Sequence, residues 1–322
     1  MFAYLGVDVS KATFDVALLN QAGKLRHKQF ANRTEGFAAL TSWLAKQEIT
    51  QVHACLEATG PYSSALADYL HEAGHKVSVV NPLRIQAFAK SQLSRNKTDK
   101  ADAALIAHFC QSQQPELWTP PPPHLRELQA LVRHLEALQE TRQQQSNRLE
   151  MQSVTTVQTS LVALLDYLDA EIERVQEHIQ VHIQRHPDLQ RQKTLLTSIP
   201  GIGDLTAAKL LAEVERLSSY KSARQAAAYA GLTPRQHQSG SSVRGQTRLS
   251  KTGSARVREA LYLPAVVAMR CNPIIRNLCQ RLRERHKNSM VIVGAAMRKL
   301  LHSAYGVLKT GRPFDPQYAP AP

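Results

Sequence analysis

Two aspartates three residues apart, at the predicted start of a helix, are the clearest sign of chemistry in this 322-residue chain. Asp99 and Asp102 follow Thr98, and their spacing places both carboxylates on one helical face. The cations around them are Arg95, Lys97 and Lys100. Acids held together in a basic setting suggest a divalent-metal site that faces a polyanion. The alternative is an ordinary helix start, with Thr98 as N-cap and both acids favoured by the helix dipole.

Two further acids lie in unusual surroundings. Asp8 lies within the apolar run Tyr4–Val9, and Glu57 ends the apolar run Val52–Glu57. A buried, unpaired carboxylate is costly, so such residues are normally paired or bind metal, unless the strand end meets solvent. Four carboxylates without His or Cys favour Mg²⁺ or Mn²⁺ over zinc. Two such ions can activate a nucleophile and stabilise a leaving oxygen at a phosphodiester.

The elements that must position these acids follow from the apolar patterns. Three strands joined by short links form an antiparallel meander: Tyr4–Val9, Phe14–Leu19 and Leu25–Phe30. Helix, strand, helix and strand follow: Glu35–Ala45, Val52–Glu57, Tyr62–Ala73 and Lys76–Val80. This is the element order of an RNase H-like fold, in which the first and fourth strands are adjacent. We therefore expect the four acids to meet at one edge of the sheet.

The middle of the chain predicts a linker and a helical hairpin. Thr119–Pro123 is Pro-rich and marks a boundary. Apolar residues at heptad spacing then follow in two runs: Leu125, Leu128, Val132, Leu135 and Leu138, then Leu161, Leu165, Leu168, Ile172, Val175, Ile179 and Ile183. We expect an antiparallel pair that also contacts a second subunit, the alternative being two amphipathic helices packed on a core. The predicted domains are 1–118, 119–190 and 191–322.

A glycine-rich turn opens the last domain. Ile199–Gly203 reads Ile-Pro-Gly-Ile-Gly between two helical segments and resembles the helix-hairpin-helix motif. In that motif the backbone N–H groups at a helix N-terminus hold a DNA phosphate, and Gly201 and Gly203 would allow the close approach. A plain helical turn is the alternative. Helices at Ala255–Arg270, Pro273–Arg285 and Met290–Lys309 complete a mainly helical domain.

The charge of the chain is +14, and it is concentrated unevenly. No acid occurs between Arg216 and Arg258, whereas these cations do: Arg216, Lys221, Arg224, Arg235, Arg244, Arg248, Lys251, Arg256 and Arg258. This run predicts a nucleic-acid face. Within it, Ser239 is either part of a flexible loop that hydrogen-bonds phosphate or a nucleophile, which needs a base or metal. The candidate phosphate contacts are Arg235, Ser241, Arg244, Arg248 and Lys251.

Other classes of protein fit poorly. No apolar run approaches the roughly 20 residues of a spanning helix, and the N-terminus lacks a signal-peptide pattern, so no membrane partner is expected. The four cysteines form no C-x-x-C pair: Cys55, Cys110, Cys271 and Cys279. A disulfide framework or zinc site is therefore not expected, whereas a reducing cytoplasm is.

Along nearly its full length the chain resembles the DEDD transposases of insertion-sequence elements of the IS110 family, relatives of Piv-type DNA invertases. The motifs are Gly-Val-Asp8-Val-Ser-Lys, Leu-Glu57-Ala-Thr-Gly, Asn-Lys-Thr-Asp99-Lys-Ala-Asp102-Ala, Ile-Pro-Gly-Ile-Gly, Ala230-Gly-Leu-Thr-Pro and Ser239-Gly-Ser-Ser-Val-Arg-Gly. The resemblance implies a RuvC-like N-terminal domain, a coiled-coil connector and a transposase domain. It implies an acidic tetrad that binds Mg²⁺ (Asp8, Glu57, Asp99 and Asp102), and Ser239 as a nucleophile that forms a 5′-phosphoserine link to DNA.

The resemblance also implies partners. A structured bridge RNA from the same element pairs with target and donor DNA, and dimers assemble into a tetramer in which different subunits form composite sites. The chain departs from the expected pattern at His237-Gln238, where an acid such as Glu is expected before Ser239, so a local general base is not indicated. Two rival functions remain: a metal-dependent nuclease of the Holliday-junction-resolving kind, and a non-catalytic nucleic-acid-binding regulator.

Overall fold

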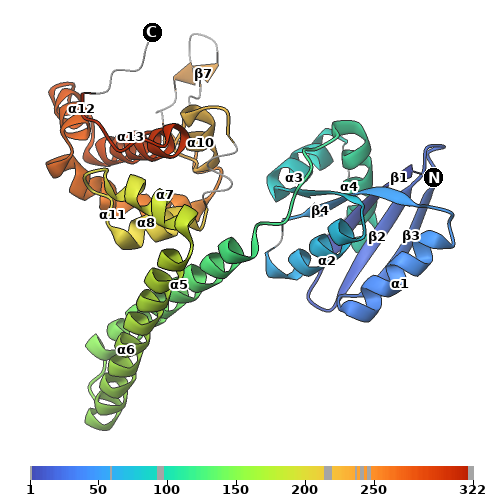
Figure 1. Cartoon of the computed structure of the whole chain (residues 1–322), viewed down its shortest axis with the longest axis horizontal. Helices are drawn as coiled ribbons and strands as arrows, with labels where there is room; N and C mark the ends of the chain where they lie inside the picture. Colours follow the sequence, from blue (N-terminus) through green and yellow to red (C-terminus); the bar gives the residue numbers. More distant parts are fainter. Residues whose placement is uncertain are drawn as a thin grey trace. The chain divides into compact units, whose positions relative to one another are not determined.

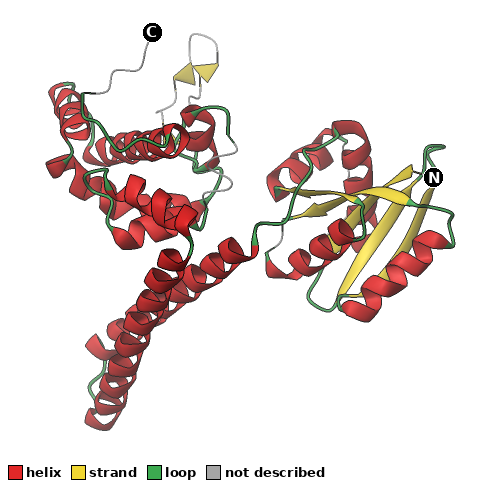
Figure 2. Ribbon diagram, in the orientation of Figure 1, coloured by secondary structure: helices red, strands yellow, loops and turns green. Residues whose placement is uncertain are grey.

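The computed structural model divides into two compact units, residues 1–120 and 121–322 (Figure 1). It describes residues 2–58, 60–92, 98–213, 220–235, 238–239, 243–244 and 248–317. The first unit is a mixed α/β domain; the described part of the second is helical apart from two short two-stranded ribbons (Figure 2). The predicted combination of an α/β part with a mainly helical part is confirmed.

A five-stranded sheet forms the centre of the first unit. Its strands are β1 (Phe2–Val9), β2 (Thr13–Leu19), β3 (Leu25–Ala31), β4 (Gln51–Glu57) and β5 (Lys76–Val80). They lie in the order β3-β2-β1-β4-β5, with β1 to β3 antiparallel and β4 and β5 added in parallel. The predicted meander is therefore present, and the first and fourth strands are neighbours.

Helices cover both faces of this sheet (Figure 2). They are α1 (Thr34–Ala45), α2 (Pro61–Glu72), α3 (Pro82–Ser91) and α4 (Asp99–Gln113). Helices α1 and α2 cross between the parallel strands and share a core with one face, where Leu5 packs with Leu40 and Leu66. Helix α4 packs on the other face, against β1, β2 and β4, with α3 beside it. The sequence did not predict α3, which starts at Pro82 behind an Asn81 cap.

The approach of α4 to the sheet is closest at Gly6. A Cβ atom at this position would lie 2.1 Å from the carbonyl oxygen of Ala103 and 2.2 Å from the amide nitrogen of Ala107. Because alternate residues of a strand share a face, Gly6 and Asp8 both point toward α4. Ala103 directly follows Asp102, so this backbone contact also brings the first turn of α4 to Asp8.

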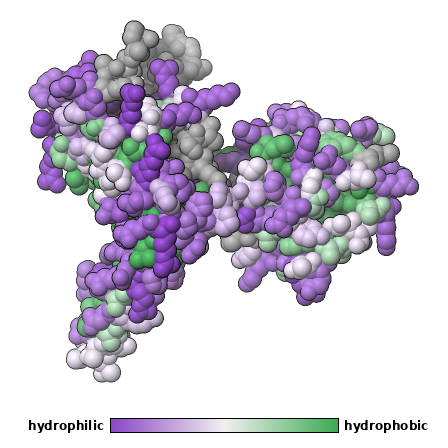
Figure 3. All heavy atoms as spheres, in the orientation of Figure 1, coloured by the Kyte–Doolittle hydropathy of each residue, from purple (hydrophilic) through white to green (hydrophobic). Residues whose placement is uncertain are grey.

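A helical hairpin opens the second unit (Figure 1). Its helices, α5 (Pro123–Glu150) and α6 (Thr155–Arg185), bury most of the predicted apolar residues against one another: Leu125, Leu128, Val132, Leu135, Leu161, Leu168, Ile172, Val175, Ile179 and Ile183. Arg142 joins the helices by a two-pronged ion pair with Asp169. Met151 and Val154, in the turn, are 88% and 54% exposed, and the hairpin tip is pale in Figure 3.

The helical body follows the hairpin. Its described helices are α7 (Pro187–Thr197), α8 (Asp204–Leu211), α10 (Ala223–Tyr229), α11 (Ala255–Cys271), α12 (Pro273–Glu284) and α13 (Ser289–Thr310). Helix α13 packs against α7, α10, α11 and α12. The ribbons pair β6 (Pro234–Arg235) with β9 (Arg248–Leu249), and β7 (Gln238–Ser239) with β8 (Val243–Arg244). Of the helices described, none has the length and apolar character that crossing a bilayer requires.

We predict that Gly6→Ala destabilises the first unit by at least about 2 kcal/mol, because the added methyl group must push α4 off β1. Urea unfolding followed by tryptophan fluorescence measures this directly, since both tryptophans, Trp43 and Trp118, lie in this unit. Gly23→Ala is the control. Gly23 has a φ of +77°, so an alanine there strains the backbone, but no atom lies within 4 Å of the new Cβ and there is no clash. A loss for Gly6→Ala no larger than for Gly23→Ala contradicts the prediction.

Candidate active site

The four predicted acids lie at one end of the first unit's sheet. Strands β1 and β4 run in parallel with Val7 opposite Leu56, so Asp8 and Glu57 occupy the next position on each strand. Asp99 and Asp102 lie in the first turn of α4, which packs on the same strands. We call these four residues the acidic edge. Asp99 is exposed and the other three are half-buried, so solvent reaches them.

The start of α4 also has the features of an ordinary capped helix. Thr98 Oγ1 accepts a hydrogen bond of 3.2 Å from the Ala101 N–H. Acids in the first turn also interact favourably with the helix dipole. The same residues can therefore cap the helix and contribute to a metal site. Lys100 is exposed on the same turn, whereas Arg95 and Lys97 lie outside the described residues.

The carboxylates of the acidic edge share one electrostatic field. Burial, as the largest cause, and then the negative charges of Asp102, Asp99, Glu57 and Asp15, in that order, together raise the pKa of Asp8 from 3.8 to about 6. Each neighbouring anion disfavours ionisation of Asp8. A raised pKa means that the negative charge is not fully compensated by the protein itself, which is the condition under which a cation binds favourably.

Asp15 is a fifth acid that the sequence analysis missed. It lies in β2 directly opposite Asp8 and is only 6% exposed. The Gln29 side-chain amide donates a 2.8 Å hydrogen bond to Asp15 Oδ2, and His27 Nε2 lies 2.8 Å from Oδ1. Only the pairing register of β1 and β2 reveals that Asp15 faces Asp8. In the sequence, the available signal was that side chains alternate between the two faces of each strand in the predicted meander.

The acids are gathered but do not converge. Within the ranges that the structure describes, no three His, Cys, Asp or Glu side chains form a group that could hold a metal ion as they stand. The chemistry of the donors nevertheless fits a hard cation, because all four predicted ligands are carboxylates.

Ser239 lies in the second unit, in the short ribbon of β7 and β8. Its Cα is paired with that of Val243, and Gln238 is paired with Arg244. Ser241 lies outside the described residues.

The second ribbon carries two cations opposite one another. Arg235 of β6 pairs with Arg248 of β9, and both are exposed. Like charges directly across a strand pair are unfavourable unless an anion lies between or above them. Lys251, with a φ of +53°, is exposed just beyond β9. This surface therefore favours a bound polyanion.

Arg258 differs from the rest of the basic run. Its guanidinium Nη1 donates to three backbone carbonyl oxygens, those of Ala230 (3.0 Å), Gly253 (3.4 Å) and Ser254 (3.2 Å). The side chain thus holds the end of α10 against the start of α11. Arg258 stabilises the fold and is not available to the nucleic-acid face in which the basic run placed it.

The two glycines of the predicted phosphate-binding turn have different surroundings. Gly201 has a φ of +105°, and a Cβ there would lie 2.6 Å from the Cβ of Ala268 in α11. It is therefore required by packing within the body. Gly203 precedes α8, and its Cβ position is open. Asp204 follows and pairs with Lys193 at 3.1 Å. Phosphate binding by this turn stays a prediction.

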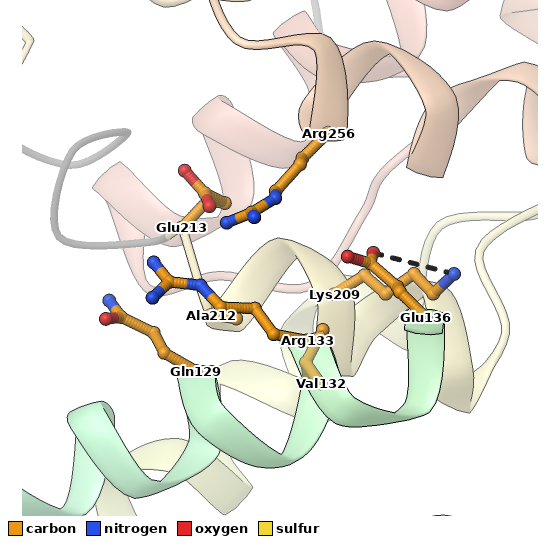
Figure 4. A pocket seen from close by; sticks show the side chains of 8 residues that line it. All are labelled: Gln129, Val132, Arg133, Glu136, Lys209, Ala212, Glu213 and Arg256. Carbon is orange, nitrogen blue, oxygen red and sulfur yellow. Dashed lines mark ion pairs between the residues drawn. The ribbon is translucent and has the colours of Figure 1, made fainter. Parts of the chain in front are cut away.

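A charged pocket lies between α5, α8 and the start of α11 (Figure 4). Arg133 and Arg256 extend toward Glu213 in this view. Glu213 also accepts a 2.9 Å hydrogen bond from the Tyr229 hydroxyl, and Lys209 pairs with Glu136 at 3.7 Å. The cavity of about 10 Å³ is no larger than one water needs, so it holds no substrate. The cluster instead joins the hairpin to the body.

Comparisons with known proteins match both the first and the last part of the chain. A transposase family model matches residues 5–154, and a model described as the transposase IS116/IS110/IS902 family matches residues 193–280. The pilin gene-inverting protein of Moraxella bovis is 36% identical over 315 residues, covering 97% of each chain, and that of Moraxella lacunata is equally similar. The transposase for insertion sequence element IS1328 of Yersinia enterocolitica is 26% identical over 97% of this chain and 98% of its own.

The raised pKa of Asp8 predicts a pH-dependent gain in stability for Asp8→Asn. Because the folded pKa, about 6, exceeds the ordinary 3.8, the contribution of this group is fully present below pH 3.8 and is lost as pH rises to about 6. In metal-free buffer near pH 7 the variant should be about 1 kcal/mol more stable than the wild type, a figure reduced for solvent screening of this half-exposed group. The difference should vanish toward pH 4.

Urea titrations at several pH values, read by tryptophan fluorescence, measure this difference. Glu72→Gln, at an exposed residue of α2, removes one charge from the same unit away from the acidic edge. If Asp8→Asn is less stable than the wild type at neutral pH, or if its advantage persists unchanged at acid pH, the acidic edge is not under electrostatic strain.

Proposed function

This chain belongs to the IS110 family of DEDD transposases and is related to pilin gene-inverting proteins, and from this premise we propose that it cuts and rejoins DNA strands through a phosphoserine on Ser239. It is a DNA-recombining enzyme. The observation that carries the proposal is the gathering of four carboxylates around Asp8, whose pKa is raised to about 6. Such an edge suits phosphodiester chemistry with a divalent cation.

In the proposed cleavage step, Ser239 Oγ attacks the phosphorus of a phosphodiester. A serine–phosphate bond forms, the bond from phosphorus to the 3′ oxygen breaks, and the leaving 3′ oxygen takes a proton as the serine hydroxyl loses one. In rejoining, a 3′ hydroxyl of another strand attacks the phosphoserine and releases Ser239. Phosphodiester bonds are conserved, so no energy-supplying cofactor is needed. Gln238 precedes the serine and is not a base, so activation must come from elsewhere.

We propose that the acidic edge supplies this activation. Asp8, Glu57, Asp99 and Asp102 would hold Mg²⁺ or Mn²⁺. A bound divalent ion would favour loss of the serine proton and stabilise charge on the phosphate oxygens. Asp15 is held by its own partners on β3 and adds negative charge beside Asp8. The strand order β3-β2-β1-β4-β5 supports a RuvC-like identity for this unit.

The basic surfaces of the second unit would hold the DNA. Arg235 and Arg248 stand opposite one another, and a phosphate between them relieves their repulsion. Arg244, Ser241 and Lys251 are the further contacts proposed from the sequence. The open N-terminus of α8 behind Gly203 would accept a phosphate in the manner of a helix-hairpin-helix.

Guidance and assembly are part of the same proposal. By its resemblance to the family, the protein would use a bridge RNA to select target and donor DNA. It would act as a dimer that assembles into a tetramer. The exposed apolar side chains of the hairpin support self-association, because Met151 and Val154 at its tip and Tyr167 further along α6 are 88%, 54% and 63% exposed. The proposed sites would be completed by different subunits.

A second function deserves a test, because the acidic edge has no need of the serine to cut DNA. A nuclease of the junction-resolving kind would use the same four acids with water as nucleophile. It would leave free ends and no protein–DNA bond.

We predict that Ser239→Ala abolishes a covalent protein–DNA adduct that the wild type forms with Mg²⁺. Purified protein, RNA transcribed from the sequence flanking its gene, and labelled DNA are incubated together. The products are denatured and digested, and the phospho-nucleotide is located by mass spectrometry. The expected adduct is on Ser239 and is lost on chelation or in Asp8→Asn.

Ser250→Ala is the matched control, because Ser250 lies in the same basic region. It should leave the adduct unchanged. Free cut ends that depend on Mg²⁺ and persist in Ser239→Ala would replace the phosphoserine proposal with the nuclease.

We also predict that Mg²⁺ or Mn²⁺ raises the melting temperature of the wild type and not that of Asp8→Asn. A cation bound only by the folded state stabilises it in proportion to the logarithm of its concentration. Thermal melts across a metal titration, with Glu72→Gln as control, measure this without any activity. Equal responses in all three proteins would place the cation elsewhere.

A further inference from the structure

Helix α12 presents a second basic surface that lies outside the basic run described above. Its exposed side chains, together with those just after it, include five cations: Arg276, Arg281, Arg283, Arg285 and Lys287. Glu284 is the one acid in the sequence between Arg276 and Lys287. No ion pair joins any of these cations to an acid within the described residues. The region of α12, at the upper left of Figure 3, is correspondingly hydrophilic.

Three of the cations lie on the exposed side of α12. Ile275 and Cys279 are completely buried in the body, which fixes the rotation of the helix. Arg276, Gln280 and Arg283, at positions i, i+4 and i+7, then lie on one exposed face. Arg276 and Arg283 are about 10 Å apart along the axis, from a rise of about 1.5 Å per residue. Arg281 lies at the opposite edge of the exposed side, about 140° round the axis from Arg276, and Glu284 lies between these two edges. We call Arg276, Gln280, Arg281 and Arg283, which span this exposed side, the α12 stripe.

Helix stability does not account for this stripe. Cations in the last turn favour a helix, which covers Arg281 and Arg283. Arg276 is in the first turn, where a cation opposes the dipole, and the first turn holds no acid to compensate it. The arrangement therefore costs the isolated protein stability, and an anionic partner would recover it.

The stripe is also held rigidly. The buried Asn272 caps α12 by accepting from the N–H groups of Ile274 (3.2 Å) and Ile275 (3.3 Å). Its side-chain amide donates to the carbonyl oxygen of Pro200 at 3.2 Å. One side chain thus fixes α12 to the turn that contains Gly201. Arginines on a helix that is already fixed in place lose less freedom when they bind a charged partner.

The chemistry of the stripe selects among polyanions. A membrane is disfavoured, because the apolar face of α12 is buried and cannot insert. Unpaired nucleic acid is disfavoured, because α12 contains no Phe, Tyr or Trp on which bases could stack. Guanidinium groups match phosphates in a two-pronged manner, and Gln280 can hydrogen-bond sugar or phosphate oxygens.

We propose that the α12 stripe is an anchor for the phosphate backbone of duplex nucleic acid, separate from the surface around Ser239. Figure 1 places α12 and β7 at different sides of the second unit. The proposal rests on the proposed function in one respect, since it assumes that this enzyme handles nucleic acid. It adds that one second unit holds duplex at two places. Recognition at the stripe is independent of sequence, because no base-reading contact is required.

The test compares two triple variants of the full chain with the same loss of charge. Arg276→Gln/Arg281→Gln/Arg283→Gln removes the stripe. Arg33→Gln/Arg142→Gln/Arg174→Gln removes three arginines that already pair with acids. Binding of labelled duplex DNA and duplex RNA is measured by fluorescence anisotropy with EDTA, so that cleavage and the acidic edge play no part. Salt is varied between about 50 and 200 mM.

We expect the stripe variant to bind duplex about tenfold or more weakly. The slope of its log affinity against log salt concentration should correspond to about three fewer phosphate contacts. The control variant should bind like the wild type. The duplex that loses more affinity, DNA or RNA, identifies the natural occupant. Equal binding by both variants, or a loss confined to single strands, overturns the proposal.

Because the side chains of the α12 stripe are exposed, the stripe variant should melt like the wild type, whereas the control variant loses the Arg142–Asp169 ion pair and should melt lower. If the stripe variant melts lower, the single variants Arg276→Gln and Arg283→Gln decide the outcome, each against Arg33→Gln. A failure of the phosphoserine mechanism leaves these binding results unchanged, so the two proposals fail separately.

Discussion

Carboxylates placed side by side repel one another, and the acidic edge exists because a backbone contact holds it together against that repulsion. Gly6 lets α4 approach β1 until the carbonyl of Ala103 occupies the space of a side chain. The apolar packing of α4 over β1, β2 and β4 then keeps Asp99 and Asp102 beside Asp8. Burial at this position, followed by the charges of the neighbouring acids, raises the pKa of Asp8 to about 6. The packing of α4 on the sheet therefore holds several negative charges close together at one end of the sheet.

Much of this architecture could be predicted from the sequence, because it depends on local periodicity. The meander, the crossover helices and the buried residues of the hairpin all follow spacings of two, 3.6 or 3.5 residues. The positions of Asp8 and Glu57 followed from their places in apolar strands. Helix α3 was missed because it is short and follows directly on β5, leaving little room for an amphipathic repeat.

The features that could not be predicted depend on contacts between distant residues. Asp15 faces Asp8 only through the register of two strands. Arg258 looked like a surface cation, but its guanidinium reaches three carbonyls of a neighbouring turn. Gly201 is predicted as a phosphate contact, which stays a prediction, and its φ and the proximity of Ala268 add a packing role that the sequence did not indicate. In each case the packing or bonding role of the residue is visible only in the tertiary structure.

The first unit holds negative side chains close together and the second unit holds positive side chains close together, and this has a kinetic consequence. Arg235 faces Arg248 across a ribbon, whereas the acids face one another across β1, β4 and α4. On the proposed function, the basic surfaces would hold DNA at any time, whereas the acidic edge would repel a phosphate until a cation neutralised it. The enzyme would then remain on DNA in a bound but inert state. The order of loading would be cation first and scissile phosphate second, which would suppress strand breakage during the search.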